Sequence, residues 1–248
     1  MVGPTAVGKT ALSIRLAKEF DGEIINADSQ QVFRELSIGT AKPTAEELAS
    51  APHHLIDVKS IQESYSVDEF VKNAREKIED ITKRGKLPIL VGGTGLYVQS
   101  LLEDYSFGGS KSDADRRERY QRFAEESGAL ALWNVLEQKD PIAASKIPYQ
   151  NTRRVIRALE VFDLTGESLH AEGRRAKFYV YDTFLIGLNT DREILYERIN
   201  SRVDQMVEEG LMEEAKMLFE QPEDLQVKSA IGYKEFWPYF EGGTTFEE

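Results

Sequence analysis

The stretch Gly3-Pro-Thr-Ala-Val-Gly-Lys-Thr10 decides the fold of this chain. Its spacing, Gly-x-x-x-x-Gly-Lys-Thr, is typical of a P-loop, in which backbone N–H groups of the loop and of the next helix surround phosphate oxygens. Lys9 supplies a positive charge, and the Thr10 hydroxyl is placed to bind Mg²⁺. The sequence therefore predicts a diphosphate or triphosphate site formed by Gly3, Pro4, Thr5, Ala6, Val7, Gly8, Lys9 and Thr10.

The segments that follow the loop alternate between helix and strand patterns. Residues 9–20 and 66–84 carry apolar positions at helical spacing, whereas 23–27 and 87–91 are short apolar runs that indicate strands, the second buried on both faces. Strands that alternate with helices indicate a parallel sheet. We therefore expect an α/β fold of the P-loop NTPase type, with helices on both faces of a parallel sheet.

The pattern changes between residues 107 and 175. There the helical periodicity continues through 116–139 and 151–164 without a strand between them. An apolar run that indicates a strand then returns at 178–188, and helices are expected at 191–208, 210–220 and 229–240. We therefore expect a P-loop core domain formed by residues 1–106 and 176–248, interrupted by an all-helical insertion domain at 107–175.

Composition limits the class of protein. The 248 residues contain no cysteine and carry a formal net charge of −12. We expect a soluble, cytoplasmic protein without a membrane partner, and nothing in the sequence requires more than a monomer. Only Met1 and Val2 precede the P-loop, so we expect the strand that normally leads into it to be shortened. Because the net charge disfavours generic nucleic-acid binding, an RNA-binding face would have to come from clustered arginines.

Two polar residues follow the expected strands. Phosphoryl-transfer enzymes with a P-loop need an aspartate after an apolar strand, yet 87–91 is followed by Gly92-Gly-Thr-Gly95. Asp28 instead follows 23–27, at the sheet edge where ligands of open α/β sheets bind. It is a candidate general base or metal ligand, or alternatively a cap of the following turn. Thr94 could bind a phosphate or ribose between glycines that admit a ligand, or belong to an ordinary turn.

Arginines at helical spacing are the remaining candidates. Arg198 and Arg202 share one helix face, and Arg153, Arg154 and Arg157 form a second group. Each group could bind phosphate, or could simply be a solvated helix face.

Taken together, the motifs resemble the bacterial tRNA dimethylallyltransferase family, also called the tRNA isopentenyltransferases. They occur in one order along nearly the whole chain: the P-loop, Asn-Ala-Asp-Ser-Gln-Gln-Val-Phe (26–33), Ile-Gly-Thr-Ala-Lys-Pro (38–43), Pro-His-His-Leu-Ile-Asp (52–57), Val-Gly-Gly-Thr-Gly-Leu-Tyr (91–97), Arg-Arg-Val-Ile-Arg-Ala-Leu-Glu-Val (153–161) and Glu-Arg-Ile-Asn-Ser-Arg-Val-Asp-Gln-Met (197–206). The resemblance implies transfer of a dimethylallyl group from dimethylallyl diphosphate to the exocyclic amine of the adenosine that follows the anticodon, with release of diphosphate.

The resemblance also implies a role for individual residues. Asp28 would accept the proton of the adenine amine, Lys9 and the rest of the P-loop would hold the diphosphate with Mg²⁺, and Arg202 with Thr94 would offset its negative charge. The helical insertion would bind the anticodon stem-loop. The implied tRNA contacts are Asp28, Ser29, Gln30, Gln31, Thr94, Arg117, Arg153, Arg154, Val155, Ile156 and Arg157.

Three other functions stay open at this point. A small-molecule or nucleotide kinase would bind ATP in the same loop and release ADP. An adenylate prenyltransferase would modify a free nucleotide, although it has no need of a helical insertion with arginines. A non-catalytic phosphate-binding module would tolerate the loss of Asp28. The family also continues beyond the position of Glu248 with a basic segment, so we expect part of its tRNA face to lie outside these residues.

Overall fold

The computed structural model describes residues 1–103, 113–170 and 179–245. It divides into two compact units, which we call the core unit (Met1–Leu101 with Asp182–Glu248) and the helical lobe (Leu102–Tyr181). The domain boundaries predicted from the sequence, at 106/107 and 175/176, lie outside the described residues, as does the first residue of the strand predicted at 178.

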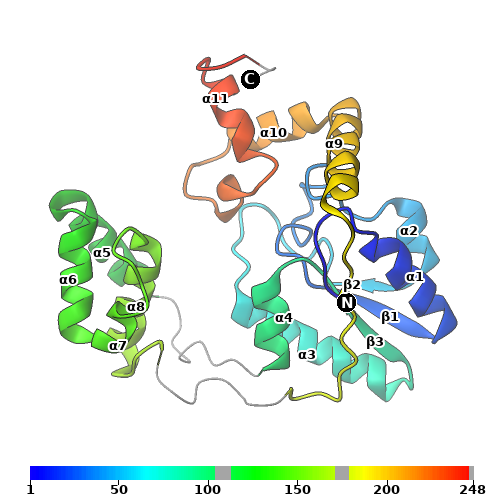
Figure 1. The fold of residues 1–248 in the computed structure, drawn as a ribbon, viewed down its shortest axis with the longest axis horizontal. Helices are drawn as coiled ribbons and strands as arrows, with labels where there is room; N and C mark the ends of the chain where they lie inside the picture. The colour runs from blue at the N-terminus through cyan, green and yellow to red at the C-terminus, as the bar shows by residue number, and fades with distance from the viewer. Residues whose placement is uncertain (104–112, 171–178, 246–248) are drawn as a thin grey trace. The chain divides into compact units, whose positions relative to one another are not determined.

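Helices and strands alternate as far as α4 (Gly95–Leu102), and the described elements after it are all helices (Figure 1). The elements of the core unit are α1 (Lys9–Glu19), β1 (Gly22–Asn26), α2 (Ala45–Ser50), β2 (His53–His54), α3 (Val67–Lys83), β3 (Leu87–Val91), α4 (which ends at the unit boundary), α9 (Arg192–Glu208), α10 (Leu211–Phe219), the 3-10 helices η1 (Gln226–Ser229) and η2 (Lys234–Phe236), and α11 (Trp237–Phe240). The lobe contains α5 (Ala114–Ser127), α6 (Ala129–Lys139), α7 (Pro141–Ala144) and α8 (Thr152–Thr165).

The sheet has the strand order β2-β1-β3, and both pairings are parallel. β1 and β3 are in register from Gly22 opposite Leu87 to Asn26 opposite Val91. Every residue of β1 is buried, as expected for a central strand. The mixed fold with a parallel sheet that the sequence predicted is therefore confirmed.

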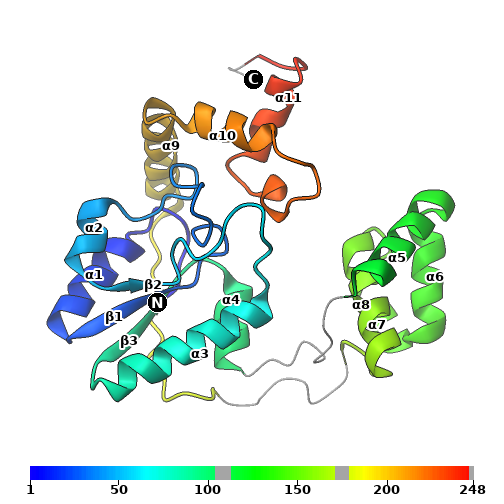
Figure 2. The same cartoon turned by 180° about the vertical axis from the view of Figure 1, so that it is seen from behind.

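Helices pack against both faces of this sheet. Ile24 of β1 packs with Ile14 and Ala17 of α1. Because side chains alternate along a strand, the neighbouring Ile25 points to the opposite face. α3 contacts β1 and β3 and buries Phe70, and both views show it running alongside the strands (Figures 1 and 2).

Two strand predictions are wrong in part. The strand expected at 178–188 is reduced, among its described residues, to a single parallel bridge between Gly187 and Val2. The Val2 N–H donates to Ile186 O (2.9 Å) and the Leu188 N–H to Val2 O (2.9 Å). The Val180 N–H also donates to Leu102 O (2.9 Å), so the described residues of this segment make isolated backbone contacts and no continuous ladder. β3 is also not buried throughout, since Leu87 is 47% exposed and Val91 is its one buried residue.

Two helix predictions are also corrected. The helix expected over 116–139 is two helices, because Gly128 adopts a φ of +89° between α5 and α6. The helix expected over 229–240 is the short η2 and α11, preceded by Gly232 with a φ of +94°. Positive φ ends a helix, and glycine reaches it without steric cost.

The helical lobe has a hydrophobic core of its own. Its helices bury one apolar cluster, which consists of Tyr120, Leu132, Leu136, Ala143, Ala144, Ile147, Val155, Ile156, Ala158 and Leu159. Trp133 packs against this cluster and donates its indole N–H to Ile147 O (2.7 Å). The lobe therefore holds together by its own packing.

A buried carboxylate joins the sheet to the end of α3. The Glu23 side chain on β1 is 5% exposed and accepts hydrogen bonds from the guanidinium of Arg84 (Nη2 to Oε2, 2.8 Å) and from Nε2 of His54 (2.7 Å). These partners, Arg84 foremost, lower the pKa of Glu23 from 4.5 to about 2 against the opposing effect of burial.

We predict that Glu23→Gln destabilises the chain in a pH-dependent way. A carboxyl whose pKa is lower in the folded chain stabilises it fully above the unfolded pKa, and this contribution disappears as the pH falls towards the folded value, here from 4.5 to about 2. At pH 7 the variant should lose about 2–3 kcal/mol of unfolding free energy. Urea unfolding at several pH values should show the difference from wild type shrinking below pH 4.5.

The matched control is Glu79→Gln, whose carboxylate is exposed on α3 and paired with Lys83. This substitution should change the unfolding free energy by no more than about 0.5 kcal/mol. A Glu23→Gln difference that is the same at pH 7 and pH 3 would contradict the prediction.

Candidate active site

The P-loop presents the N-terminus of α1 as an anion site. Gly8 precedes the helix with a φ of +94°, and no side chain caps the helix N-terminus. The first N–H groups of a helix have no partner within it, and the helix dipole gives that end a partial positive charge. Lys9 Nζ donates to Gly3 O (2.9 Å) and Pro4 O (2.7 Å), so its ammonium group lies over the loop. The loop thus offers N–H donors and a cation together.

Two glycines near the site are required by close packing. A Cβ on Gly3 would lie 2.6 Å from Leu188 O, and one on Gly92 would lie 2.2 Å from Ala27 O. Gly93 and Gly95, in contrast, have open space around them. The two glycines that flank Thr94 therefore leave room beside the backbone, as predicted, whereas Gly92 is needed for the contact between two strand ends.

A cavity of about 710 Å³ brings the predicted residues of the core unit together. It is lined by part of the P-loop, by the end of β1, by residues of the 37–42 loop and by one face of α9. The predicted residues on its wall are Thr5, Ala6, Gly8, Lys9, Thr10, Asp28, Gln31 and Arg202, whereas Gly3, Pro4, Val7, Ser29, Gln30 and Thr94 lie outside it.

Lys9, Asp28 and Arg202 act on one another electrostatically. Burial lowers the pKa of Lys9, the Asp28 carboxylate opposes this lowering, and the Arg202 guanidinium adds to it. These effects require the three charges to be near one another. An anion beside Lys9 and Arg202 would relieve the repulsion between the two cations.

Asp28 is held by the turn that follows β1. Its Oδ1 accepts the N–H groups of Gln30 (2.8 Å) and Gln31 (3.3 Å), and its own N–H donates to Asn26 Oδ1 (3.2 Å). Among the described residues, no hydrogen bond to the other carboxylate oxygen, Oδ2, is found. The two interpretations of Asp28 are therefore compatible, because one oxygen caps the turn while the carboxylate lines the cavity.

Thr94 links the ends of β1 and β3. Its Oγ1 accepts the Ser29 N–H (3.0 Å) and lies 3.3 Å from Ser29 Oγ. Gln31 Nε2 donates to Thr40 O (3.0 Å) and Ala41 O (3.1 Å). The hydroxyl of Thr94 thus fixes the turn that carries Asp28.

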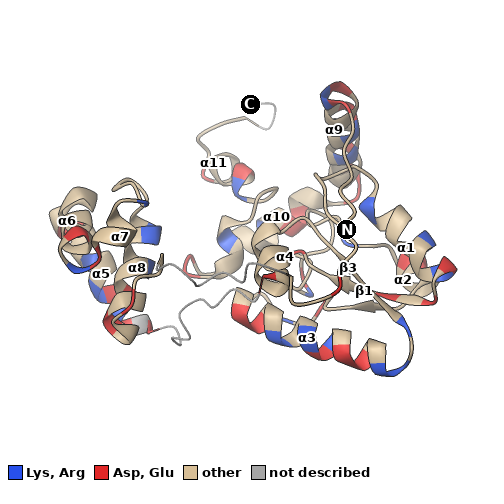
Figure 3. Cartoon of the chain, turned by 60° about the horizontal axis from the view of Figure 1, so that its bottom comes forward, with Lys and Arg blue, Asp and Glu red and all other residues tan. Residues whose placement is uncertain are grey.

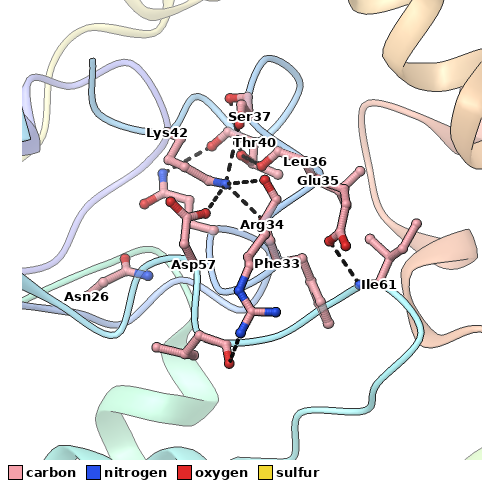
Figure 4. Close-up of polar contacts among 12 residues, drawn as sticks. Asn26, Phe33, Arg34, Glu35, Leu36, Ser37, Thr40, Lys42, Asp57 and Ile61 are labelled. Atoms are coloured by element: carbon pink, nitrogen blue, oxygen red, sulfur yellow. Dashed lines mark hydrogen bonds and ion pairs between the residues drawn. The ribbon is translucent and has the colours of Figure 1, made fainter. Parts of the chain in front are cut away.

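No role was predicted for the 33–42 loop, whose polar contacts are drawn in Figure 4 and whose residues 37, 38 and 40–42 line another side of the cavity. Its Lys42 side chain is 6% exposed and donates to Phe33 O (2.8 Å) and to the Asp57 carboxylate. Ala41 and Asp57 adopt positive φ of 50° and 56°. Non-glycine residues in this region cost free energy and persist where surrounding contacts hold them. No residue type signals this conformation, although Lys42 and Asp57 both belong to motifs quoted above.

In the lobe, a buried carboxylate holds two of the predicted arginines. Glu160 is fully buried and accepts from Arg117 Nε (2.9 Å), Arg157 Nη1 (2.7 Å) and the Asp113 N–H (2.8 Å). Arg157 keeps 26% and Arg117 45% of its side chain exposed. These guanidinium groups are therefore oriented by the protein itself.

The remaining predicted residues of α8 differ in exposure. Arg153 and Arg154 are exposed. Val155 and Ile156 belong to the hydrophobic core of the lobe, with 0% and 7% exposure. Their side chains pack against the other lobe helices, so they have a packing role, and the expected RNA contact at these positions stays a prediction.

A P-loop at the edge of a parallel α/β sheet, with an aspartate and an arginine on the same cavity, defines a P-loop protein built to bind a phosphorylated ligand. The model of one family, IPP transferase, matches residues 31–248. The chain belongs to this family.

Several relatives have high sequence identity to the chain. It is 57% identical to a tRNA dimethylallyltransferase of Enterococcus faecalis, covering 100% of this chain and 80% of that protein. A tRNA dimethylallyltransferase of Bacillus cytotoxicus is 51% identical, with coverage of 100% and 79%.

Solved structures agree with this relationship. The crystal structure of a tRNA isopentenylpyrophosphate transferase from Bacillus halodurans matches with a TM-score of 0.70 at 48% identity, covering 99% of this chain and 78% of that one. A eukaryotic dimethylallyltransferase acting on tRNA matches with a TM-score of 0.82 at 35% identity, with coverage of 97% and 62%. The enzyme class and the P-loop fold predicted from the sequence are confirmed. Across the parts of the chain that the structure describes, no helix combines the length and apolarity needed to cross a membrane.

We predict that Lys9→Ala weakens binding of inorganic diphosphate. Hydrogen bonds to a charged partner contribute about 1.5–3 kcal/mol, so the affinity should fall by on the order of tenfold to a hundredfold. Isothermal titration calorimetry with Mg²⁺ present measures the loss directly. Lys18→Ala, which removes an exposed lysine from the last turn of the same helix, should bind like wild type. Equal affinities for the two variants would contradict the assignment.

Proposed function

We propose that this chain transfers the dimethylallyl group of dimethylallyl diphosphate to the exocyclic amine N6 of the adenosine 3′ of the anticodon in tRNA. The observation that carries the proposal is the single cavity onto which the P-loop, Asp28 and Arg202 all open. The names of the relatives support the choice of donor and acceptor.

The P-loop would hold the leaving group. As the carbon–oxygen bond breaks, its electron pair and negative charge pass to the diphosphate. The N-terminus of α1, Lys9 and Arg202 place positive charge around that position. Donors that are already oriented stabilise charge that grows in the transition state, and removing one costs on the order of 10²–10³ in rate.

Asp28 would serve as the general base. The N6 nitrogen forms a bond to the reacting carbon while diphosphate leaves, and the extra proton on nitrogen passes to the Asp28 carboxylate. Oδ1 is engaged by the turn N–H groups, which fixes the carboxylate at the cavity wall. We assign the proton to Oδ2.

Mg²⁺ fits this donor set as a partner of the diphosphate. The described residues contain no group of three or more acidic or histidine ligands that could hold a metal ion by themselves. Mg²⁺ usually binds through few protein groups together with substrate phosphates and water. Thr10 would contribute its hydroxyl, and the bound cation would supply charge that offsets the diphosphate.

Arg117, Arg153, Arg154 and Arg157 of the lobe would contact the phosphates of the anticodon stem-loop. The target adenosine would leave the base stack to reach the cavity. A net charge of −12 is compatible with this, because a docking face needs only local positive charge. Elements of the core unit such as α3 and α9 carry charges of both signs (Figure 3). A cytoplasmic location and a monomeric state stay predictions.

We predict that Asp28→Asn abolishes transfer while tRNA binding changes little. The amide keeps the size of the side chain and can still accept the turn N–H groups, but it cannot take the proton. Labelled dimethylallyl diphosphate incubated with tRNA, with AMP or with neither measures the transfer. The control Glu46→Gln alters an exposed carboxylate on α2 outside the cavity and should transfer normally. Wild-type protein that labels neither acceptor but hydrolyses ATP would favour the kinase.

We predict that the double variant Arg153→Ala with Arg154→Ala weakens tRNA binding and its salt dependence. Each lost phosphate contact should lower the slope of log affinity against log salt by about 1. Filter binding over a range of salt concentrations measures both quantities. Arg122→Ala, an exposed lobe arginine paired with Glu118, serves as the control. An unchanged slope in the double variant would contradict the role of the two arginines.

A further inference from the structure

Glu214 of α10 binds one short stretch of backbone with unusual completeness. Its carboxylate accepts the N–H groups of Ser37 (2.8 Å), Ile38 (3.0 Å) and Gly39 (3.0 Å), and also the hydroxyl of Tyr233 (2.6 Å). Successive backbone N–H groups that converge in this way form an anion-binding nest. A carboxylate with charge-assisted hydrogen bonds to both oxygens holds its partners more firmly than a neutral group would.

The bound stretch is part of the cavity wall. Ser37 and Ile38 line the cavity beside the P-loop. Gly39 packs so closely on the buried ring of Tyr233 that a Cβ there would lie 2.6 Å from the ring carbon Cζ. Glu214 therefore joins the cavity wall to α10 through a tightly packed, hydrogen-bonded contact, which we call the Glu214 clamp (Glu214, Tyr233 and residues 37–39).

Helix α9, which carries Arg202, has little packing to fix it in place. None of its residues is buried, and its main contact with another described element is with α10. Gly210, with a φ of +105°, joins the two helices, and a Cβ there would lie 3.7 Å from Ile38 Cδ1. In Figures 1 and 2, α9 projects away from the sheet and meets α10 at one end. The position of Arg202 thus depends on how α10 is held.

We propose that Glu214 is a positioning residue for Arg202. By clamping α10 to residues 37–39, it fixes the α9–α10 pair against the core unit and sets where the Arg202 guanidinium lies on the cavity. The catalytic consequence rests on the proposed function, in which Arg202 offsets charge on the departing diphosphate. The mechanical consequence, a fixed distance between α9 and the P-loop helix α1, does not depend on that function.

The mechanical part is tested by distance measurement. Because the chain has no cysteine, Lys18→Cys on α1 and Asn200→Cys on α9 introduce two exposed sites for nitroxide labels. Electron–electron double resonance should give one narrow distance distribution in the otherwise wild-type chain. Glu214→Gln should shift or broaden it, because the amide NH₂ cannot accept from the backbone donors. The control is Glu213→Gln, which makes the same charge change at an exposed neighbouring residue and should leave the distance distribution unchanged. An unchanged distribution in folded Glu214→Gln would overturn the clamp.

The catalytic part is tested by kinetics in two backgrounds. In the wild-type background, Glu214→Gln should lower kcat by on the order of tenfold to a hundredfold, with little change in KM for tRNA, as expected for a displaced catalytic group. In an Arg202→Ala background it should cause no further loss of kcat. If the two substitutions together lower kcat by the product of their separate factors, the link to Arg202 is overturned, even if the label distance changes. Effects of residues that act through one another do not combine independently. Wild-type protein without transfer activity would contradict the proposed function but leave the distance result standing.

Discussion

The parallel pairing of β1 with β3 is the constraint on which the site depends. Beyond the register of the two strands, the pairing continues through Ala27 N–H to Val91 O (2.8 Å) and Thr94 N–H to Ala27 O (3.3 Å). Gly92 has no room for a Cβ against Ala27, so the strand ends must approach this closely. As a result Asp28 and Thr94 come to one edge of the sheet beside the P-loop. Backbone hydrogen bonds between the two strand ends thus decide where the candidate base Asp28 lies.

Features with a local physical cause could be predicted from the sequence. The P-loop, β1 and α3 each follow from spacing, apolar periodicity or capping within a few residues, and these predictions agree with the structure to within about two residues. The strand prediction at 178–188 failed because a strand exists only with a paired neighbour, and the described residues of this segment form a single bridge, between Gly187 and Val2. Likewise, the role of the 33–42 loop depends on Glu214, which lies 175 positions from Gly39. No short-range pattern carries that information.

Asp28 can cap the turn that follows β1 and also present a carboxylate oxygen to the cavity, so its two interpretations do not exclude each other. A carboxylate has two oxygens, and capping a turn requires only one of them. Oδ1 bonds to Gln30 and Gln31, and those bonds limit the rotation of the side chain at the cavity wall. Thr94 repeats the pattern, because its hydroxyl fixes Ser29 and thereby the same turn. In this site the hydrogen bonds that cap the turn are therefore also the ones that orient the proposed base.

Charge in the lobe is organised in the same way. Glu160 cancels part of the charge of Arg117 and Arg157, which would weaken a purely electrostatic RNA face. It is fully buried, however, and Arg117 bonds to it through Nε, which leaves the terminal N–H groups of a guanidinium that is 45% exposed. A guanidinium held in one orientation loses less conformational entropy when it binds a phosphate. An acidic chain can therefore bind a polyanion through a few oriented donors. The smaller entropy loss of these donors on binding offsets the weaker long-range attraction.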